Sequence, residues 1–330
     1  MNPTELQQKF FSHLKGSLKA NLSVADELAD LLDISADSAY RRIRGEKPLS
    51  LQELKIICEK HRLSLDQILD LQNESVLFQA PGINQDVLPF NIYMRQTLQQ
   101  LKYFNTFGRK HMMCLNKDMA FFHNYYYPEI AAFKSFFWAK TIFNDPEYSN
   151  QKFSLAAYPF RDYFETGQQM IREYNHIPST ELWNPESFNC TIIQIQFYKD
   201  AGLFGNPADM ELVVKSFIKT IDHLELQLEK GVKFMPGDTD VSYKSSLTFY
   251  VNEVVLGNNT ILLELDEQRL AYITYSVMQY IISHDQRFYR NVHSNFTTLL
   301  SRSTLISGAG ERDRNRFFNA VREKANSLLR

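Results

Sequence analysis

Aromatic residues are distributed unevenly along this chain, and their distribution predicts two folding units with different cores. The first 72 residues contain three of the 44 Phe, Tyr and Trp residues, and all the others follow them. A chain of 330 residues also exceeds the usual length of one domain, so each part can bury its own core. We expect a first domain at residues 1–72, a linker at 73–90 around Pro81-Gly82, and a second domain at 91–330.

The first domain is predicted to consist of five short helices. Residues 4–7, with the sequence Thr-Glu-Leu-Gln, have the form of a capping box that opens the first helix. Each later helix is expected to begin at a serine N-cap: Ser23, Ser35, Ser50 and Ser64. Residues 50–53, with the sequence Ser-Leu-Gln-Glu, form a second capping box. Between the second and third helices, Asp33 is expected to adopt the left-handed backbone of a tight turn, and Gly45 ends the third helix.

A cluster of positive charge lies on the third of these helices and just beyond its end. Four cationic side chains and one acid lie within residues 40–47, although the first 72 residues contain 10 Lys and Arg against 11 Asp and Glu. At about 100° per residue, the buried side of this helix is predicted to contain Ala36, Ala39 and Ile43. Arg41 is then almost opposite that side, while Tyr40 and Arg42 lie on its flanks.

Several positions in these helices follow one known pattern. They are Leu28-Ala29 in the second helix, Ile34-Ser35 at the turn, Ala39 in the third helix, Gly45 at its end, and Pro48 to Ser50 before the fourth. At these positions, residues 1–70 resemble the lambda-repressor-like, XRE-type helix-turn-helix. Two positions depart from the family pattern. Asp33 replaces the glycine that is common at the turn, and Arg42 occupies the second inward apolar position, whose role Ile43 is expected to take.

The resemblance implies a five-helix, lambda-repressor-like DNA-binding domain whose third helix enters the major groove, with two copies on a two-fold symmetric site. Arginine can bond a guanine edge bidentately, while Ser and Tyr can bond phosphates or base edges. The residues expected to contact double-stranded DNA are Ser35, Asp37, Ser38, Tyr40, Arg41, Arg42, Arg44 and Lys47. An ordinary solvated helix face is the alternative interpretation of the same charges.

The second domain is expected to be mainly helical over residues 91–235. Its helices are predicted at residues 91–106, 128–144, 158–174, 185–204 and 208–231. Three β-rich runs within residues 246–275 predict a small antiparallel β meander, and C-terminal helices are expected over residues 276–329. The predicted fold class is therefore α+β, mainly α with a small β meander.

Two segments of the second domain each allow two interpretations. Apolar residues recur at three- and four-residue steps over residues 208–231, which indicates a core-facing helix or a dimer seam. Residues 121–143 hold ten aromatic rings, which indicates a packed core or an aromatic-lined ligand cavity. Because one nearly neutral DNA-binding domain makes few phosphate contacts, we expect a homodimer formed mainly by the second domain.

The sequence contains no residue pattern that is typical of a catalytic or metal site. Its cysteines, Cys58, Cys114 and Cys190, lie far apart without CxxC pairing, and its histidines are scattered. We therefore expect no enzyme activity, no cofactor and no bound metal. No uncharged apolar run approaches about 18 residues, so neither a membrane segment nor membrane binding is expected, and the location is expected to be cytoplasmic.

These features together predict a sequence-specific transcription regulator, and the resemblance implies a bacterial one. Its second domain is expected to sense an effector or to form the dimer, and a small molecule of unknown identity would then be a further partner. Two alternatives stay open. One is an enzyme that carries an N-terminal helical module, and the other is a protein-interaction adaptor that no longer binds DNA.

Overall fold

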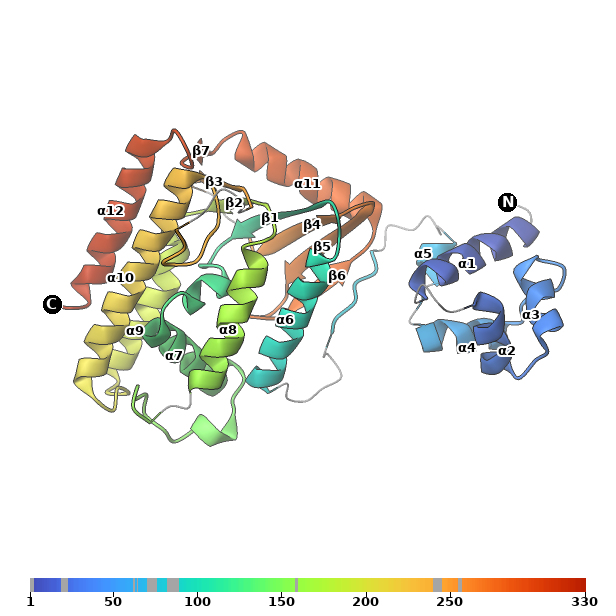
Figure 1. The fold of residues 1–330 in the computed structure, drawn as a ribbon, viewed down its shortest axis with the longest axis horizontal. Coiled ribbons are helices and arrows are strands. Elements are labelled where there is room, and N and C mark those ends of the chain that lie inside the picture. Colours follow the sequence, from blue (N-terminus) through green and yellow to red (C-terminus); the bar gives the residue numbers. More distant parts are fainter. Residues whose placement is uncertain are drawn as a thin grey trace. The chain divides into compact units, whose positions relative to one another are not determined.

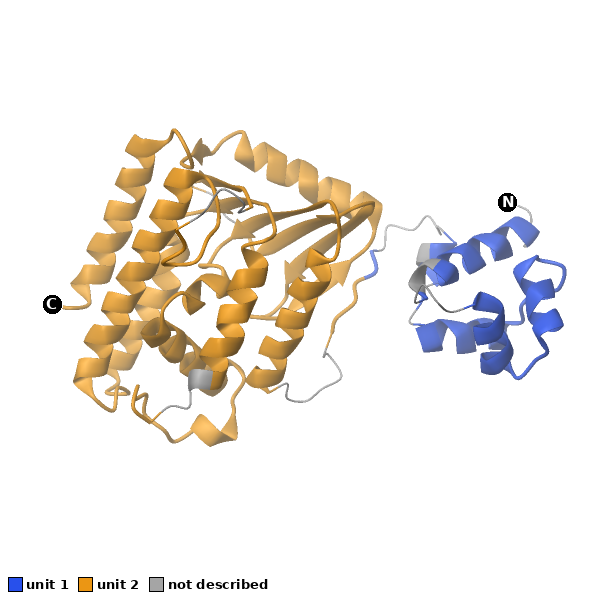
Figure 2. Cartoon of the chain, in the orientation of Figure 1, with its two compact units in different colours: residues 1–77 blue, residues 78–330 orange. Residues whose placement is uncertain are grey.

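The chain has a mainly helical α+β fold, as the sequence predicts, and it divides into two compact units. The computed structural model describes residues 3–18, 23–61, 63, 65–69, 76–81, 89–157, 160–239, 245–254 and 257–330. The first unit comprises residues 1–77 and the second unit comprises residues 78–330 (Figure 2). The boundary between them falls inside the segment predicted as a linker.

The described residues of the first unit form five helices, as predicted. They are α1 (Pro3–Ser17), α2 (Val24–Leu32), α3 (Ala36–Ile43), α4 (Leu51–His61) and α5 (Leu65–Ile68) (Figure 1). Ser23 and Ser35 cap α2 and α3, because their hydroxyl oxygens accept hydrogen bonds from the backbone N–H groups of Asp26 at 3.5 Å and Ser38 at 3.3 Å. Ser64, the N-cap predicted for the fifth helix, lies outside the described residues.

The two capping boxes predicted in the first unit have different outcomes. At α4 the backbone N–H of Glu53 donates to the Ser50 hydroxyl at 3.2 Å, and the Ser50 N–H donates to the Glu53 carboxylate at 2.8 Å. The box predicted at residues 4–7 is wrong. Because α1 begins at Pro3, the whole box lies within the helix, and the Gln7 side chain instead bonds Arg42 at the end of α3 and Lys47 beyond it.

A small apolar core holds these five helices together. Its buried members are Phe10, Phe11, Leu14, Ala25, Leu28, Ala39, Ile57 and Ile68. They come from all five helices, so each short helix is stabilised by tertiary packing that its own length does not provide.

The second unit is built on one mixed sheet with the strand order β6-β5-β4-β1-β2-β3-β7. The strands are β1 (Lys110–Asn116), β2 (Ser179–Trp183), β3 (Leu247–Val251), β4 (Thr260–Leu265), β5 (Gln268–Thr274), β6 (Tyr280–Ser283) and β7 (Thr304–Leu305). β1, β2 and β3 are parallel, whereas β4 pairs antiparallel with β1 and continues into β5 and β6. β7 pairs antiparallel with β3.

Helices cover both faces of this sheet (Figure 1). They are α6 (Phe90–Asn105), α7 (Pro128–Phe137), α8 (Phe160–Tyr174), α9 (Asn189–Asp200), α10 (Pro207–Lys230), α11 (Gln286–Leu300) and α12 (Glu311–Ser327). Short 3-10 turns η1 (Phe121–Tyr125), η3 (Pro146–Tyr148) and η4 (Pro185–Phe188) and a π turn η2 (Trp138–Ile142) connect them. Met112 of β1 belongs to the large core that the other helices share, whereas Met113 belongs to a smaller core with Tyr289 and Phe296 of α11.

Four strands of the described residues were not predicted. β1 and β2 lie in the gaps between the helices expected over residues 91–235, and β6 and β7 lie within residues 276–329, where only helices were expected. β1 and β2 are central parallel strands with long runs of buried residues, so they lack the alternation that marks a half-exposed strand. β7 has only two residues, which is too short for a recognisable pattern.

The predicted meander is wrong in its first strand. The three runs do form strands, but β3 pairs with β2 and β7, and the antiparallel meander consists of β4, β5 and β6. The hydrophobic pattern identified β3 as a strand. It did not show which strands pair with β3, because strand pairing depends on contacts far apart in the sequence.

Part of the predicted linker belongs to the second unit. Gln79 forms backbone hydrogen bonds with Ile282 in both directions, each 2.8 Å long, and covers the free edge of β6. Phe78 packs edge-on against Phe288 of α11, with ring centroids 5.2 Å apart. The linker segments that lie outside the described residues are 73–75 and 82–88.

The two open interpretations in the second unit are settled by burial. On α10, Val213, Phe217 and Ile221 are fully buried in the unit, so the stripe of residues 208–231 faces the core and is not a dimer seam. In residues 121–143, most rings belong to the same core. Phe133 packs edge-on against Phe153 and Tyr198 at centroid distances of 5.5 Å and 5.2 Å.

A polar cluster is enclosed in the second unit around Glu181 of β2, which is 1% exposed. The Glu181 carboxylate accepts hydrogen bonds from the Ser179 hydroxyl at 3.0 Å, the Trp183 indole N–H at 2.9 Å and the Asn116 amide at 3.2 Å. The Tyr174 hydroxyl donates a further hydrogen bond. These donors come from β1, β2 and α8, so one carboxylate joins three elements of the unit.

Two basic side chains also lie near this carboxylate. His123 Nε2 lies 3.9 Å from Glu181 Oε2, and the Lys233 ammonium lies 3.5 Å from the centroid of the Tyr174 ring. Burial by itself raises the pKa of Glu181, but His123, Lys233 and the Tyr174 hydroxyl together lower it to about 2. The carboxylate is therefore ionised inside the core.

Candidate nucleic-acid interface

The turn between α2 and α3 orients the helix that carries the positive charge. Asp33 closes α2 with φ 52° and ψ 54°, and the Ile34 N–H donates to the Ala29 carbonyl oxygen at 3.0 Å. This confirms the left-handed conformation predicted for Asp33. Ser35 then caps α3, and α3 packs against α2.

Most of the predicted DNA contacts reach solvent on α3 or just beyond its ends. The side chains of Arg41 and Arg44 are 54% and 59% exposed, and Tyr40 is 51% exposed. The other exposed members of the set are Ser35, Asp37 and Lys47, and Ser38 is half-buried. The structure thus brings every predicted contact except Arg42 to the solvent side of this helix-turn segment.

Arg42 is buried, so its predicted place on the exposed flank of α3 is wrong. Its side chain is 4% exposed, Nη2 lies 2.6 Å from Glu53 Oε1, and Nη1 donates to the Ser38 carbonyl oxygen at 3.1 Å. Ile43, which was expected to take the inward position, is only half-buried, and Ala36 is exposed. Arg42 can keep the inward position because its aliphatic stem packs and Glu53 neutralises its charge.

Glu53 joins α3 to α4. It caps α4 through Ser50 and pairs with Arg42, although the two partners lie on different helices. Burial by itself raises the pKa of Glu53, but the hydrogen bonds from Arg42 and Ser50 hold the pKa below its ordinary value. The sequence identified Glu53 as a capping residue. It gave no sign of the pair, because the pair depends on how α3 and α4 pack.

Gln7 and Gly45 fix the segment that follows α3. The Gln7 amide nitrogen donates to the carbonyl oxygens of Arg42 at 2.6 Å and Lys47 at 2.8 Å. Gly45 has φ 81°, and a Cβ at this position would lie 2.5 Å from Cγ2 of Thr4. The backbone that carries Lys47 is therefore held in place while its side chain is exposed. Of these two residues, Gly45 alone was predicted from the sequence to have a structural role at the end of α3.

Glu46 reduces the positive charge of this surface. Its carboxylate oxygens lie 3.7 Å from Arg41 Nε and 3.1 Å from Arg44 Nε, and both pairs are about half exposed. Exposed ion pairs contribute about 0–1 kcal/mol, so a DNA phosphate can compete with Glu46 for either arginine. Among the exposed charges, Arg41, Arg44 and Lys47 stand against Asp37 and Glu46, which leaves a net charge of +1.

This surface lies within the region of the chain that is similar to a known family. Residues 14–98 match the family model of the BetR domain. The BetR match includes α2 to α5 and extends past the first unit into α6. It covers less than half of the chain, and it leaves nearly all of the second unit unmatched. No curated protein and no solved structure matches the chain significantly.

The described residues contain no group of three or more His, Cys, Asp or Glu side chains that could hold a metal ion. Cys58, Cys114 and Cys190 are free thiols, and burial raises the pKa of Cys114 well above its ordinary value. No helix in the described part of the chain combines the length and apolar character needed to span a bilayer.

Proposed function

We propose that the chain is a sequence-specific DNA-binding transcription regulator that acts in the cytoplasm as a homodimer. One observation carries the proposal: Arg41 and Arg44 are exposed on a serine-capped helix that packs on α2 across a tight turn. An α-helix fits the major groove of DNA, and arginines on its outer side can bond guanine edges bidentately.

The positions of the side chains suggest a division of roles. Arg41, which lies nearly opposite the buried Ala39, is the residue proposed to contact a base edge. Lys47 lies beyond the end of α3 and is proposed to contact phosphate, which positions the unit but carries no base information. Asp37, in the first turn, can accept a hydrogen bond from cytosine and would repel a nearby phosphate.

The small net charge of this surface supports two copies at each site. Three exposed cations against two carboxylates allow few phosphate contacts, and phosphate contacts supply most of the affinity of such domains. A homodimer on a two-fold symmetric site doubles the number of contacts. Since the α10 stripe is buried, the surface that joins two copies lies outside that stripe.

Selection of bound sequences from random duplex DNA with the full chain tests this proposal. We expect an enriched site with two half-sites whose centres lie roughly 34 Å apart, one turn of duplex. We also expect binding to weaken steeply with salt. Absence of any enriched sequence contradicts the proposal. So does an enriched site that the Arg41→Ala/Arg44→Ala double variant binds as tightly as the unaltered chain.

A protein-interaction adaptor is the second candidate function, and two observations favour it. Glu46 pairs with both outer arginines, and Leu51 at the start of α4 is 84% exposed in the same unit. An adaptor would use the exposed apolar residue to bind a protein partner, and the paired arginines would stay paired. The same selection experiment separates the two candidates, since an adaptor enriches no DNA sequence.

A further inference from the structure

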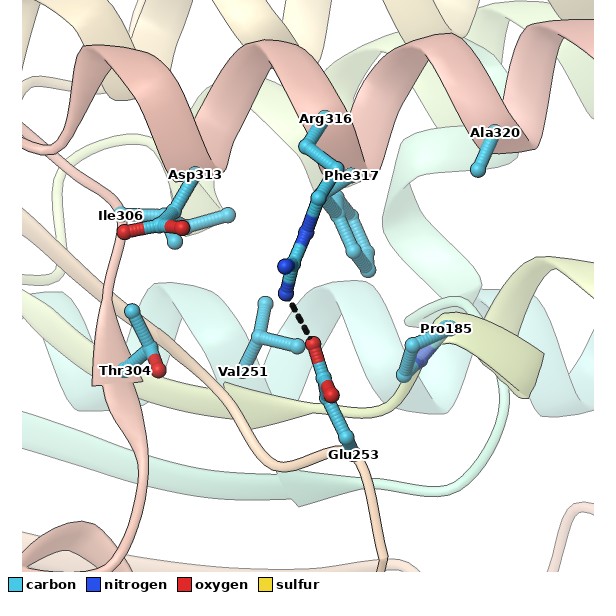
Figure 3. A pocket seen from close by; sticks show the side chains of 9 residues that line it. All are labelled: Pro185, Val251, Glu253, Thr304, Ile306, Asp313, Arg316, Phe317 and Ala320. Atoms are coloured by element: carbon cyan, nitrogen blue, oxygen red, sulfur yellow. Dashed lines mark hydrogen bonds and ion pairs between the residues drawn. The ribbon is translucent and has the colours of Figure 1, made fainter.

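A small cavity lies at the carboxyl ends of two parallel strands in the second unit (Figure 3). Its volume is about 150 Å³, and it is bounded by Pro185, which follows β2, by the end of β3, by β7 and by α12. In sheets with parallel strands, ligands bind in the crevice outside the carboxyl ends of the strands. The position of the cavity in the fold therefore suits a ligand, and no motif in the sequence marks it.

The inner part of the cavity is apolar. Val251 at the end of β3, Ile306 after β7 and Phe317 on α12 contribute to its lining, and each is less than 10% exposed. These side chains belong to the large core of the unit, so their positions are fixed by packing. An aliphatic group of a ligand would find a preformed apolar surface here.

The outer part of the cavity carries charges of both signs. Arg316 on α12 extends toward Glu253, which follows β3, and the two side chains form an ion pair (Figure 3). Asp313, one turn earlier on α12, is half-buried and lies on the side of the cavity near Ile306 (Figure 3). Within the described residues, no hydrogen bond or ion pair occupies the Asp313 carboxylate. Positive and negative groups thus stand at different places around one apolar space.

The Arg316–Glu253 pair leaves room for a ligand anion. The two side chains are 70% and 62% exposed, so the pair contributes little stability and exchanges readily with solvent. Arginine has five donors in a planar fork, so Arg316 can hold a ligand carboxylate beside Glu253 or in its place.

Gly310 and Arg314 hold α12 in the position that closes the cavity. A Cβ at Gly310 would lie 2.6 Å from the Leu305 carbonyl oxygen and 2.7 Å from Cα of Ile306, so only glycine allows this approach. The buried Arg314 guanidinium donates to the carbonyl oxygens of Ile306 at 3.0 Å and Gly308 at 2.9 Å. The wall formed by α12 is therefore tied to the strand opposite it.

The size of the cavity limits the ligand. Cavities for drug-sized molecules are about 300–1,000 Å³, whereas a cavity of about 150 Å³ holds a molecule the size of benzene. Nucleotides and larger cofactors are too big. The side chain of an aliphatic amino acid is small enough to enter, with the charged groups of the molecule at the outer part.

We infer that this cavity binds a small zwitterion, an α-amino acid with an aliphatic side chain. Its carboxylate bonds Arg316, its ammonium group bonds Asp313, and its side chain packs on Val251 and Phe317. The cavity has two acidic groups and one basic group, so a ligand that carries both charges matches it better than a simple anion does.

This inference deepens the proposed function, because it names the chemical class of the effector. It rests on the proposed function only in calling the bound amino acid an effector. Binding of the amino acid is measured without DNA. Loss of amino-acid binding with intact DNA selection would remove this inference alone. Amino-acid binding without any DNA selection would remove the proposed function alone.

Isothermal titration calorimetry of the full chain with L-leucine and L-valine tests the inference. Two analogues of leucine are the matched probes: 4-methylpentanoate lacks the ammonium group, and 3-methylbutylamine lacks the carboxylate. We expect at least one amino acid to bind and both leucine analogues to bind about tenfold more weakly or not at all, since each loses one charged anchor. No heat of binding for either amino acid at millimolar concentrations overturns the inference. Equal binding of either analogue overturns the zwitterion assignment.

Variants on α12 locate the binding. Arg316→Gln and Asp313→Asn should each weaken amino-acid binding by about tenfold. Arg312→Gln is the matched control, because Arg312 is exposed on the same helix but does not line the cavity, and it should bind unchanged. Circular dichroism checks that all three variants are folded. If Arg316→Gln and Arg312→Gln bind alike while both are folded, the site is elsewhere and the inference is wrong.

Discussion

The two units of this protein bury charge in different ways. In the first unit, Arg42 and Glu53 form one direct pair at 2.6 Å, and the partners lie 11 residues apart on neighbouring helices. In the second unit, Glu181 is held by hydrogen-bond donors from three elements, and the partners Asn116 and Glu181 lie 65 residues apart. The first arrangement orients one helix against the next, whereas the second ties distant strands and helices to one carboxylate.

This difference bears on function through the sorting of arginines in α3. Of Arg41, Arg42 and Arg44, the middle residue turns inward to Glu53, and the outer two remain exposed. The buried pair therefore fixes the rotation of α3 about its axis, and that rotation decides which cations face solvent. No comparable sorting occurs around Glu181, where the surrounding positive charge of Lys233 is also buried.

The largest change in stability is expected from replacing Glu181, because this breaks the larger of the two buried hydrogen-bond arrangements. Glu181→Leu leaves the Trp183 N–H, the Asn116 amide and two hydroxyl groups without their acceptor, so we expect a loss of about 3–5 kcal/mol in unfolding free energy. Both tryptophans, Trp138 and Trp183, lie in the second unit, so tryptophan fluorescence during urea unfolding reports on that unit alone.

Glu267→Leu is the control for this prediction. Glu267 is also a paired glutamate of the second unit, but its side chain is 88% exposed beside Arg109. Its replacement should change the unfolding free energy by less than about 0.5 kcal/mol. If the two variants unfold alike, the buried carboxylate does not hold the strands together as argued.

A smaller effect is expected for the pair in the first unit. Arg42→Ala removes a buried partner, but Glu53 is 19% exposed and can regain some water, so we expect a loss of about 2–3 kcal/mol. The first unit has no tryptophan, so far-ultraviolet circular dichroism of the full chain should show a destabilised transition that tryptophan fluorescence does not. Arg44→Ala, at an exposed position, should leave both signals unchanged.

Acid should weaken the same pair. The folded-state pKa of Glu53 lies below its ordinary value of 4.5, so the pair stabilises the first unit fully at pH values above that ordinary value. Its contribution is lost as the pH falls through the lowered pKa. The circular dichroism transition of the unaltered chain should therefore weaken more steeply in acid than that of Arg42→Ala. Parallel pH profiles would show that the pair does not form.

The sequence predicted the first unit in more detail than the second, and the two buried arrangements explain why. Helix caps such as Ser35 and Ser50 act within four residues, and a left-handed turn at Asp33 is a local property, so each is visible in a short segment. The inward rotation of Arg42 was missed because it needs Glu53 from another helix. The only sign of this rotation in the sequence was that Arg42 occupies a position that is apolar and inward in the family pattern.

In the second unit, most of the decisive contacts join distant segments. β1 and β2 are separated by several helices, and their pairing gives neither strand an alternating pattern. Glu181 lies in the short segment Ser-Thr-Glu-Leu-Trp, where an acid that follows two hydroxyl residues resembles a surface position. The cavity beside Arg316 combines η4, β3, β7 and α12, so no single motif could indicate it.

The effect expected for Arg41 concerns DNA and depends on the proposed function. Arg41→Ala should weaken binding to the selected site by about 1–3 kcal/mol and relax the preference at one base pair, because a bidentate contact to a base edge is lost. Thermal stability should not change, since the side chain is 54% exposed. Fluorescence anisotropy with duplexes that vary one base pair at a time measures both quantities. Unchanged affinity and unchanged base preference in a folded variant would exclude Arg41 as the reading residue.

The smallest expected effect belongs to Lys47, whose backbone is held by Gln7 while its side chain is free in solvent. Lys47→Ala should weaken binding to all sequences alike, and it should lower the slope of log affinity against log salt by about one, because a phosphate contact releases one counterion. Anisotropy titrations at several salt concentrations, with the selected site and with a scrambled duplex, measure this slope. A loss confined to the selected site would assign Lys47 to a base edge. In that case the surface that contacts base edges would extend past the end of α3, and Lys47 would no longer be a phosphate contact.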